Sequence, residues 1–390
     1  MKETKMYMYL DNAATTNMKQ EVLDEMIPFF IDNYGNPSAN YDLARVSKVA
    51  IEKAREQIAD LINSKPDEIY FTSGGTESDN WALLSATDKY GKKGKHIITT
   101  SIEHHAILHT TQFLEEKGYE VTYLKVDKNG IIDVEDLEKA IRPDTILISV
   151  MMANNEIGTI QPIKEIGTIA RKNKVLFHTD AVQAIGHIPI DVSKMKIDLL
   201  SGSGHKFHGP KGIGFLYVKN GLPIAPFIHG GAQENGKRAG TSNVPGIVGM
   251  GKAAEMAKRD ILNAETSKIR DYFIDRLIKE IPLCHMNGDI NNRLPNNINI
   301  RIDYVDADSL LVLLNQKGLY ASSGSACTTG QTNPSHVLKA LGLSDKEAKS
   351  SIRLSISDDF TIEEADNAVE IITECVNRLR KVSSEYKKVL

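Results

Sequence analysis

Lys206 is the residue of this sequence that is best placed for covalent chemistry. It lies in a glycine-rich turn, SGSGHKFHGPKG (residues 201–212), directly after a predicted strand. Withdrawing a lysine from water lowers its pKa, and the amine then becomes a nucleophile that can form a Schiff base. Ser203 and His205 of the same turn could contact a phosphate group. Lys211 follows a proline, which indicates a structural turn and not a second reactive amine.

A phosphate-binding turn is predicted at residues 73–77 (SGGTE), between a predicted strand and a predicted helix. Gly75 and Thr76 would lie at the start of that helix, where free backbone N–H groups and the helix dipole attract anions. The alternative is a plain turn in which Thr76 caps the helix.

Asp180 follows the residues VLFHT, at the predicted carboxyl end of another strand. Burying an ionised acid there costs free energy, so it is expected only where a cation pairs with the acid or where the acid has a functional role. It could pair with a protonated ring nitrogen, orient a histidine or bind a metal, and the alternative is an aspartate that caps a helix. Asn155, in the segment NNEIG, also follows a strand, where it either contacts a ligand or belongs to a turn.

Three histidines, His104, His105 and His109, lie close together after the strand HIITT. Neighbouring residues of a helix point to different faces, so the first two cannot easily bind one metal ion. We therefore predict one site histidine and no metal site. Together, a phosphate-binding turn, an acid for a ring nitrogen, a histidine for stacking and a lysine amine describe a site for pyridoxal 5′-phosphate, which acts as an electron sink while its ring nitrogen stays protonated.

Cys327 is the candidate reactive thiol among three cysteines. It lies in ASSGSACTTGQTNP (residues 321–334), a run of small, turn-forming residues in which an exposed thiol could act as a nucleophile. Cys284 and Cys375 lie in apolar or helical surroundings and are predicted to be packing residues. The three are far apart and form no CxxC pair, so the spacing does not support a structural zinc site.

A nucleotide-binding P-loop is rejected for residues 231–237. This segment matches GxxxxGK, but Arg238 follows where a magnesium-binding serine or threonine is needed. Two prolines also make the preceding residues 223–230 a poor central strand.

The elements that must position these residues follow an alternating pattern between residues 66 and 218. Short apolar runs alternate with helical patterns, which predicts a mostly parallel sheet with helices on both faces and a ligand site beyond the carboxyl ends of the strands. The strands are predicted at 68–72, 96–100, 120–126, 145–152, 175–178 and 198–201, and the helices at 78–90, 106–117, 134–141 and 163–173.

The remainder of the chain has a different pattern. A long stretch with helical spacing, residues 247–281, is expected to connect two domains, and it is followed by a strand at 297–302 and helices at 309–317 and 362–386. We predict a large α/β cofactor-binding domain at 15–258 and a smaller α/β domain made of 1–14 and 259–390, which carries the Cys327 loop.

Length and composition agree with this organisation. The 390 residues are about two and a half times a typical domain of ~150, which predicts two domains. There are 47 Lys and Arg against 51 Asp and Glu, a net charge of −4, which argues against nucleic-acid binding through bulk positive charge. The absence of a long apolar run or signal sequence and the sparse, odd number of cysteines predict a cytoplasmic protein.

In the order of its motifs the sequence resembles the NifS/IscS-type cysteine desulfurases, which belong to the class-V aminotransferases of pyridoxal-phosphate fold type I. The resemblance covers nearly the whole chain. The motifs that carry it are YLDNAATT, FTSGGTESDN, NNEIG, HTDAVQ, SGHKFHGPKG, RAGTSN, SSGSACT and IRLS.

The resemblance implies a role for each matching position. Lys206 would carry the cofactor and move protons, His104 would stack on its ring and assist proton transfer, and Cys327 would attack the substrate sulfur. The implied cofactor contacts are Asp180 with the ring nitrogen, Gln183 with the ring hydroxyl, Asn155, and Gly75, Thr76, Ser203, His205 and, from a second subunit, Thr241 with the phosphate. Asn155 and Arg353 would bind the substrate, with Arg353 gripping its carboxylate.

The implied reaction removes sulfur from L-cysteine, gives L-alanine, and leaves a persulfide on Cys327 for an acceptor protein. The implied partners are a second copy of the chain and a sulfur acceptor or IscU/NifU-like scaffold for Fe–S cluster assembly or thiolation. Cys327 as a transient Fe–S ligand stays open. The alternatives are another enzyme of the same fold, such as a selenocysteine lyase or an aminotransferase, and a non-catalytic assembly scaffold.

Overall fold

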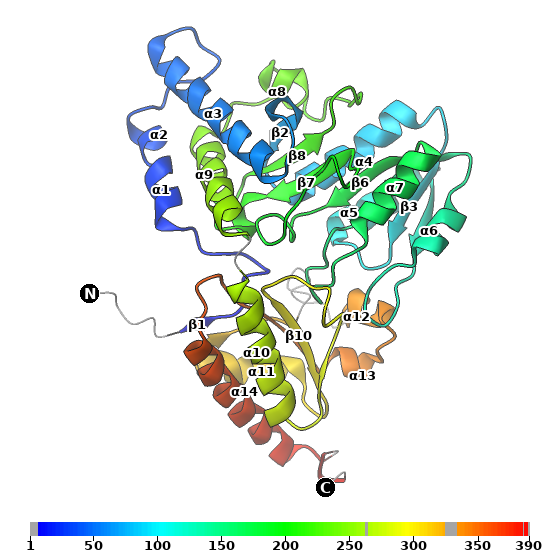
Figure 1. Cartoon of the computed structure of the whole chain (residues 1–390), viewed down its shortest axis with the longest axis vertical. Coiled ribbons are helices and arrows are strands. Elements are labelled where there is room, and N and C mark those ends of the chain that lie inside the picture. The colour runs from blue at the N-terminus through cyan, green and yellow to red at the C-terminus, as the bar shows by residue number, and fades with distance from the viewer. Residues whose placement is uncertain (1–6, 262–263, 324–333, 385, 389–390) are drawn as a thin grey trace.

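The computed structural model describes residues 7–261, 264–323, 334–384 and 386–388. Figure 1 shows two α/β units, one above the other. The upper unit contains a seven-stranded sheet in the order β2-β8-β7-β6-β5-β3-β4. Its strands are β2 (Ile69–Thr72), β3 (His96–Thr100), β4 (Glu120–Leu124), β5 (Thr145–Ser149), β6 (Leu176–Asp180), β7 (Leu199–Ser203) and β8 (Gly214–Val218).

The sheet is mostly parallel, as predicted. Strand β8 runs antiparallel to its neighbours β2 and β7, and the other paired strands are parallel. The helices that follow the strands are α4 (Gly75–Tyr90), α5 (His105–Glu116), α6 (Val134–Ala140) and α7 (Ile163–Asn173).

Burial on both faces explains why the strands of this sheet are continuous apolar runs. Every residue of β3, β5, β7 and β8 is buried. Successive strand residues point to opposite faces, so Ile98 and Leu200 pack in one hydrophobic core while Ile97 and Leu199 pack in another.

The lower unit contains a three-stranded antiparallel sheet in the order β12-β10-β9. Its strands are β9 (Cys284–Met286), β10 (Asn297–Ile302) and β12 (Ser351–Ser355), and its helices include α10 (Glu265–Glu280), α11 (Ala307–Gln316), α12 (His336–Ala340), α13 (Asp345–Ala348) and α14 (Ile362–Val382). The start of the chain joins this unit, because β1 (Met8–Tyr9) pairs in parallel with β11 (Leu319–Tyr320).

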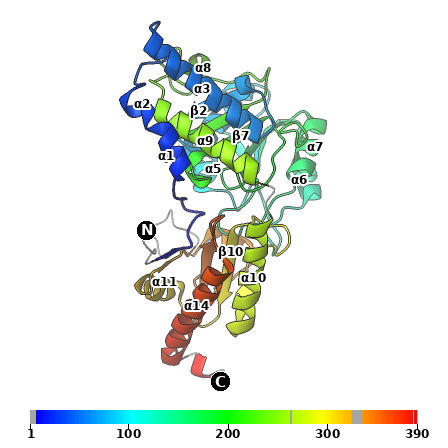
Figure 2. The ribbon, with the colours of Figure 1, turned by 60° about the vertical axis from the view of Figure 1, so that its left-hand side comes forward.

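The helical spacing over 247–281 is divided between two helices, α9 (Val244–Asp260) and α10. Helix α9 packs against α1 (Gln20–Met26) and α3 (Asp42–Leu61) in the upper unit, whereas α10 packs against α14 in the lower unit. Figure 2 shows α9 between α1 and α3 in the upper unit, and α10 beside α14 below them. The break therefore lets the chain pass from one unit to the other. Within the described chain, no helix has the length and apolar character that crossing a bilayer requires.

Candidate active site

Lys206 lies just after β7, and the N-terminal segment of the chain lies against its side chain. Its Nζ atom donates hydrogen bonds to the carbonyl oxygens of Ala13 and Ala14, at 2.7 and 2.8 Å. Gln183 donates to the same Ala13 carbonyl at 2.9 Å. One short segment thus brings together two residues that the sequence analysis assigned to a single site.

Asp180 ends β6 and is 6% exposed. One oxygen of its carboxyl group accepts a hydrogen bond of 2.9 Å from the backbone N–H of Val182. Burial raises the pKa of Asp180 to about 6, while the Val182 hydrogen bond and the positive charge of Lys206 act to lower it. A buried acid near this pKa suits the protonated nitrogen of a pyridine ring.

His104 caps the N-terminus of α5, where its Nδ1 atom accepts a hydrogen bond of 3.1 Å from the N–H of Ala106. Burial, followed by the charges of Lys206 and neighbouring histidines, lowers the pKa of His104 to about 4. The ring is therefore neutral near pH 7 and carries its proton on Nε2. A neutral imidazole can stack on an aromatic ring without repelling Lys206.

The N-terminus of α4 approaches the other site residues closely. A Cβ atom added at Gly75 would lie 2.6 Å from Cγ2 of Val182 and 3.7 Å from Cβ of Ser203. Among the described residues, no group accepts a hydrogen bond from the N–H of Gly75 or Thr76, and Thr76 is exposed. Free N–H groups at a helix start are a ready site for a phosphate.

His205, in the turn that carries Lys206, is a second neutral histidine. Its Nδ1 atom is 3.1 Å from the hydroxyl of Thr15. Burial, with the charges of Lys206 and Lys211, lowers its pKa to about 4. An anion at this position would be held by hydrogen bonds and not by an imidazolium charge.

Pyridoxal 5′-phosphate fits the residues that are brought together here. The start of α4, whose close approach to Val182 only a glycine at position 75 allows, can hold the phosphate. The nearby acid Asp180 can hold a ring nitrogen, and Lys206 supplies the amine that the aldehyde requires.

Arg353, in β12, joins the lower unit to this site. It is buried, donates 2.9 Å to the carbonyl of Asn155, and forms an ion pair of 2.7 Å with Asp11. The sequence did not predict the ion pair between Arg353 and Asp11. A substrate carboxylate bound to Arg353 would share its guanidinium group with Asp11. The neighbouring Asn154 is structural, because its buried amide donates to Ile102 and accepts two backbone N–H groups of its own turn.

Thr241 lies at the outer edge of the α4 turn. It is exposed and lines a hollow together with Ser73 and Arg238. Arg238 forms an ion pair of 2.8 Å with Glu77 in the first turn of α4. The role predicted for Thr241 involves a second subunit and stays a prediction.

Cys327 lies outside the described residues, as does most of its loop. Cys284 and Cys375 are buried, as expected for packing residues. Burial raises the pKa of Cys284 to about 12, and it also raises the pKa of Cys375. Neither thiol therefore ionises readily near neutral pH.

The histidine cluster and the segment that resembles a P-loop have other contacts in the structure. The rings of His109 and His336 lie 5.0 and 4.9 Å from that of His105, but within the described ranges no three His, Cys, Asp or Glu side chains are arranged to hold a metal ion. In the segment that resembles a P-loop, Glu234 forms an ion pair of 2.9 Å with Arg55.

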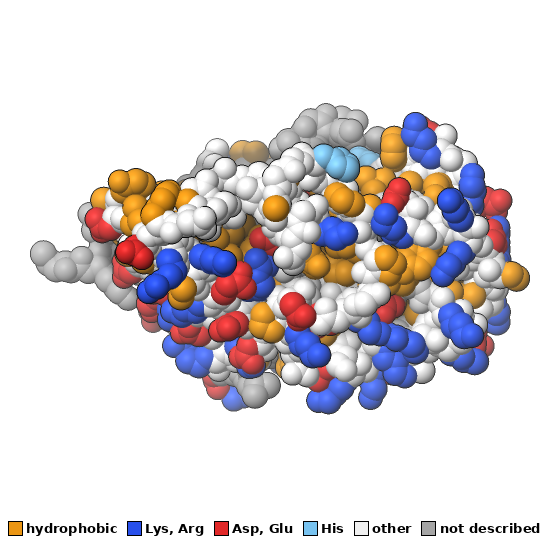
Figure 3. Space-filling view, turned by 90° about the horizontal axis from the view of Figure 1, so that it is seen from above, with side chains coloured by type: hydrophobic (Ala, Val, Ile, Leu, Met, Phe, Trp, Pro, Cys, Tyr) orange, Lys and Arg blue, Asp and Glu red, His pale blue; other side chains and the backbone are white. Residues whose placement is uncertain are grey.

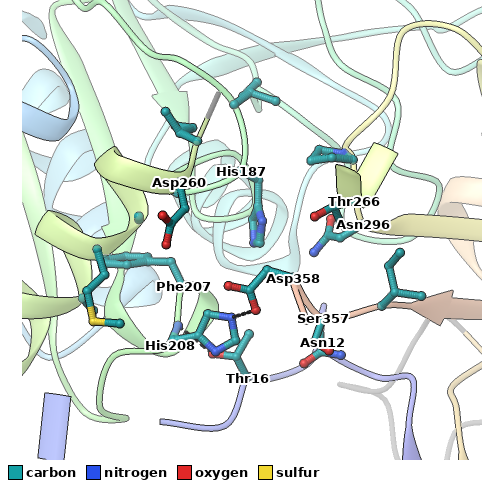
Figure 4. A pocket seen from close by; sticks show the side chains of 18 of the residues that line it. Asn12, Thr16, His187, Phe207, His208, Asp260, Thr266, Asn296, Ser357 and Asp358 are labelled. Carbon is teal, nitrogen blue, oxygen red and sulfur yellow. Dashed lines mark hydrogen bonds and ion pairs between the residues drawn. The ribbon is translucent and has the colours of Figure 1, made fainter. Parts of the chain in front are cut away.

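A separate cavity of about 490 Å³ lies beside the Lys206 turn (Figure 4). Its walls include His187, Phe207 and the ion pair of His208 with Asp358, and none of the predicted site residues. The Nε2–H of His187 donates to the carbonyl of Lys206 at 3.1 Å. His187 thus supports the turn from the cavity side, a contact for which the sequence carries no local signal.

Comparisons with known proteins agree with the fold. The sequence model of the family "Aminotransferase class-V" matches residues 8–368 of this chain. A protein of Methanosarcina thermophila named cysteine desulfurase IscS is 55% identical over 377 residues, 96% of this chain and 93% of the relative. A solved structure described as a NifS-like protein is 40% identical with a TM-score of 0.90, over 95% of this chain and all of that one. Another, described as SspA in complex with cysteine, is 41% identical with a TM-score of 0.81, over 90% of this chain and 98% of that one.

Proposed function

Since the chain belongs to the class-V aminotransferase family, we propose that it is a cysteine desulfurase that uses pyridoxal 5′-phosphate. The proposed reaction converts L-cysteine into L-alanine and leaves the sulfur as a persulfide on Cys327. The observation that carries the proposal is the gathering of Lys206, Asp180, Gln183 and His104 around one point at the ends of β6 and β7. Relatives of similar length that bear this name support it.

When bound, the cofactor supplies an electron sink for the charge that develops on the substrate's α-carbon. Asp180 would hold the proton on the ring nitrogen, and Gln183 would donate to the ring hydroxyl. The neutral imidazole of His104 would cover the ring face. The phosphate would be held by Gly75, Thr76, Ser203 and His205.

Lys206 would act as the group that moves protons at the α-carbon. Its amine now donates to two carbonyl groups of the N-terminal segment, which fixes its direction before substrate arrives. A positioned amine is an effective general base once it is neutral.

L-cysteine would be bound by Arg353 and Asn155. A guanidinium group can form two parallel hydrogen bonds with a carboxylate, and burial strengthens them. Asp11 and the Asn155 carbonyl fix the guanidinium plane from two sides. The solved relative that is described as a complex with cysteine supports this choice of substrate.

Cys327 would carry the sulfur. Its thiolate attacks the sulfur of the bound substrate, so an S–S bond forms while the C–S bond breaks. The electron pair of the broken bond stays with the substrate carbon, which takes up a proton and leaves as alanine. The persulfide then passes to an acceptor protein, and a loop is better suited to this transfer than a rigid element.

We also propose a homodimer in which Thr241 of each subunit completes the phosphate site of the other. Large apolar side chains are exposed around α2 (Pro28–Ile31) and α3, as expected for a subunit interface. They are Ile27, Phe30, Ile31, Tyr34, Tyr41, Val46 and Val49. Figure 3 shows apolar side chains gathered at the left-hand end of the upper face, the side on which Figure 1 places these helices.

The proposed partners in the cell are a sulfur acceptor or an Fe–S scaffold of the IscU/NifU type. A reducing compartment, the cytoplasm, suits an enzyme that depends on a free thiol. The same proposal includes the transient binding of an Fe–S cluster by Cys327.

The test is a paired measurement on the purified protein. The visible spectrum is recorded, and sulfide and alanine formed from L-cysteine are assayed for the wild type and for Cys327→Ala, with Cys284→Ala as the matched control. We expect a cofactor band in all three proteins, and equal sulfide and alanine that are lost only in Cys327→Ala. A coloured protein whose Cys327→Ala variant still releases sulfide contradicts the persulfide route and favours an aminotransferase or lyase. A colourless protein that cannot be reconstituted overturns the cofactor assignment.

A further inference from the structure

Two more carboxyl groups are buried close to Asp180, and the function proposed above gives them no role. Asp79 lies in α4 and is 1% exposed, and Glu103 lies between β3 and α5 and is fully buried. The charges of Asp180 and Glu103 both act on Asp79, and that of Asp180 acts on Glu103. Asp79, Glu103 and Asp180 therefore lie together in a region that is buried from water.

The region lacks the cations that would be needed to keep all three acids ionised. Among the described residues, no lysine or arginine forms an ion pair with Asp79 or Glu103. The basic group in contact with Asp79 is His178, whose Nε2 lies 3.7 Å from Oδ1 of Asp79. That oxygen has no hydrogen-bond partner in the part of the chain that the structure describes.

His178 does not supply a positive charge. It is fully buried, and its ring nitrogens lie 2.8 Å from the hydroxyl of Ser149 and 3.0 Å from that of Ser201. Burial lowers its pKa to about 3. Neutral hydroxyl groups therefore hold a neutral ring, and Asp79 has no counter-charge.

A buried carboxylate without a cation takes up a proton, because the ionised form loses its hydration without compensation. Burial and the two neighbouring acids raise the pKa of Asp79 well above its ordinary value, against a smaller lowering by Ser201. Glu103 shows the same trend with a pKa of about 8, although the Met151 N–H and the Thr100 hydroxyl both donate to it.

We propose that Asp79 is a positioning residue: a protonated carboxylic acid, held beside His178 and Ser201, that leaves Asp180 as the ionised carboxylate of the site. An ionised Asp79 would repel the charge of Asp180 and favour its protonation. The significance of this arrangement rests on the proposed function, because Asp180 must keep its charge to hold the proton on the cofactor's ring nitrogen.

The experiment is infrared difference spectroscopy on the full-length purified protein at neutral pH. The wild type is compared with Asp79→Asn, which keeps the shape of a protonated acid, and with the control Asp88→Asn at an exposed position of the same helix. We expect Asp79→Asn to remove one carbonyl band of a protonated carboxylic acid, a band that shifts in heavy water, and Asp88→Asn to remove only carboxylate bands. A difference spectrum of Asp79→Asn that contains carboxylate bands alone overturns the proposal.

Ser201→Ala keeps the test decisive should Asp79→Asn fail to fold. Removal of the hydroxyl beside Asp79 is expected to shift the same protonated-acid band, and an unshifted set of acid bands contradicts the proposal. A preparation without a visible cofactor band would overturn the proposed function and leave the infrared result intact. In a coloured preparation, Asp79→Asn should leave the pH dependence of the visible band unchanged, whereas a displaced dependence would show that Asp79 had carried a charge.

Discussion

The amine of Lys206 donates a hydrogen bond of 2.7 Å to the carbonyl of Ala13, 193 positions earlier in the chain. Gln183 donates to the same oxygen, so one peptide group orients two residues of the site. The neighbouring Asp11 forms an ion pair with Arg353. A segment that carries no reactive side chain of its own therefore aligns the amine with the guanidinium group.

Replacing Lys206 with alanine should remove the visible cofactor band and all sulfide release, because the cofactor would lose the amine that its aldehyde requires. Near-ultraviolet circular dichroism should show a folded protein. Lys211→Ala is the control and should keep its colour. Equal loss of colour in both variants would show that the cofactor is bound elsewhere or through the turn as a whole.

Gly75→Ala should weaken cofactor binding about tenfold or more, since the added Cβ would lie 2.6 Å from Cγ2 of Val182 and displace the start of α4. Fluorescence titration of the apoprotein with pyridoxal phosphate measures the affinity. The double variant Gly75→Ala/Val182→Ala removes the obstructing methyl groups and should regain most of the affinity. If the double variant binds no better than Gly75→Ala, the steric explanation is wrong.

Arg353→Lys should raise KM for L-cysteine by roughly tenfold or more with a smaller effect on kcat, because lysine cannot replace a bidentate, planar guanidinium group. Steady-state alanine formation gives both constants. Arg301→Lys, on a neighbouring strand and paired with Asp303 at 2.9 Å, is the matched control and should leave KM unchanged. An unchanged KM in Arg353→Lys would remove this residue from substrate binding.

His187→Gln should make the protein less sensitive to acid. Burial lowers the pKa of His187 to about 4, whereas an unfolded histidine titrates near 6.5. The unfolded chain thus binds more protons between these values, and stability is lost as the pH falls through this window. At pH 5 the loss amounts to about 2 kcal/mol. Urea unfolding at pH 7 and pH 5 should show a smaller drop for His187→Gln than for the wild type, while the exposed His229→Gln should match the wild type.

The elements of the sheet could be predicted well where the residues are apolar and the period is clear. The strands at 96–100 and 297–302 and the helix at 163–173 have the predicted bounds. Helix α4 begins at Gly75, three residues before the predicted start, because its polar first turn carries no hydrophobic period. The predicted domain boundary near residue 258 stays a prediction.

The apolar runs before Asp180 and Lys206 predict that these side chains lie at the ends of strands, as they do, but their hydrogen-bond partners could not be predicted. Asp11 and Arg353 are 342 positions apart, and no local pattern links them. The support of Lys206 by His187 depends on a turn between strands that brings the two together. Sequence patterns indicate which side chains are candidates for chemistry, whereas tertiary packing decides which main-chain groups orient them.

The pairing of β1 with β11, and of Asn12 with Ser355 across 343 positions, has a consequence for how the protein is made. A ribosome adds roughly 5–20 residues per second. Strand β1 is therefore synthesised tens of seconds before the segments with which it pairs. The large sheet can form during this interval, but the carbonyl groups that orient Lys206 remain unanchored to the lower unit. Newly made chains should therefore gain their core early and their site last, which makes the nascent enzyme a client for chaperones until its final third has emerged.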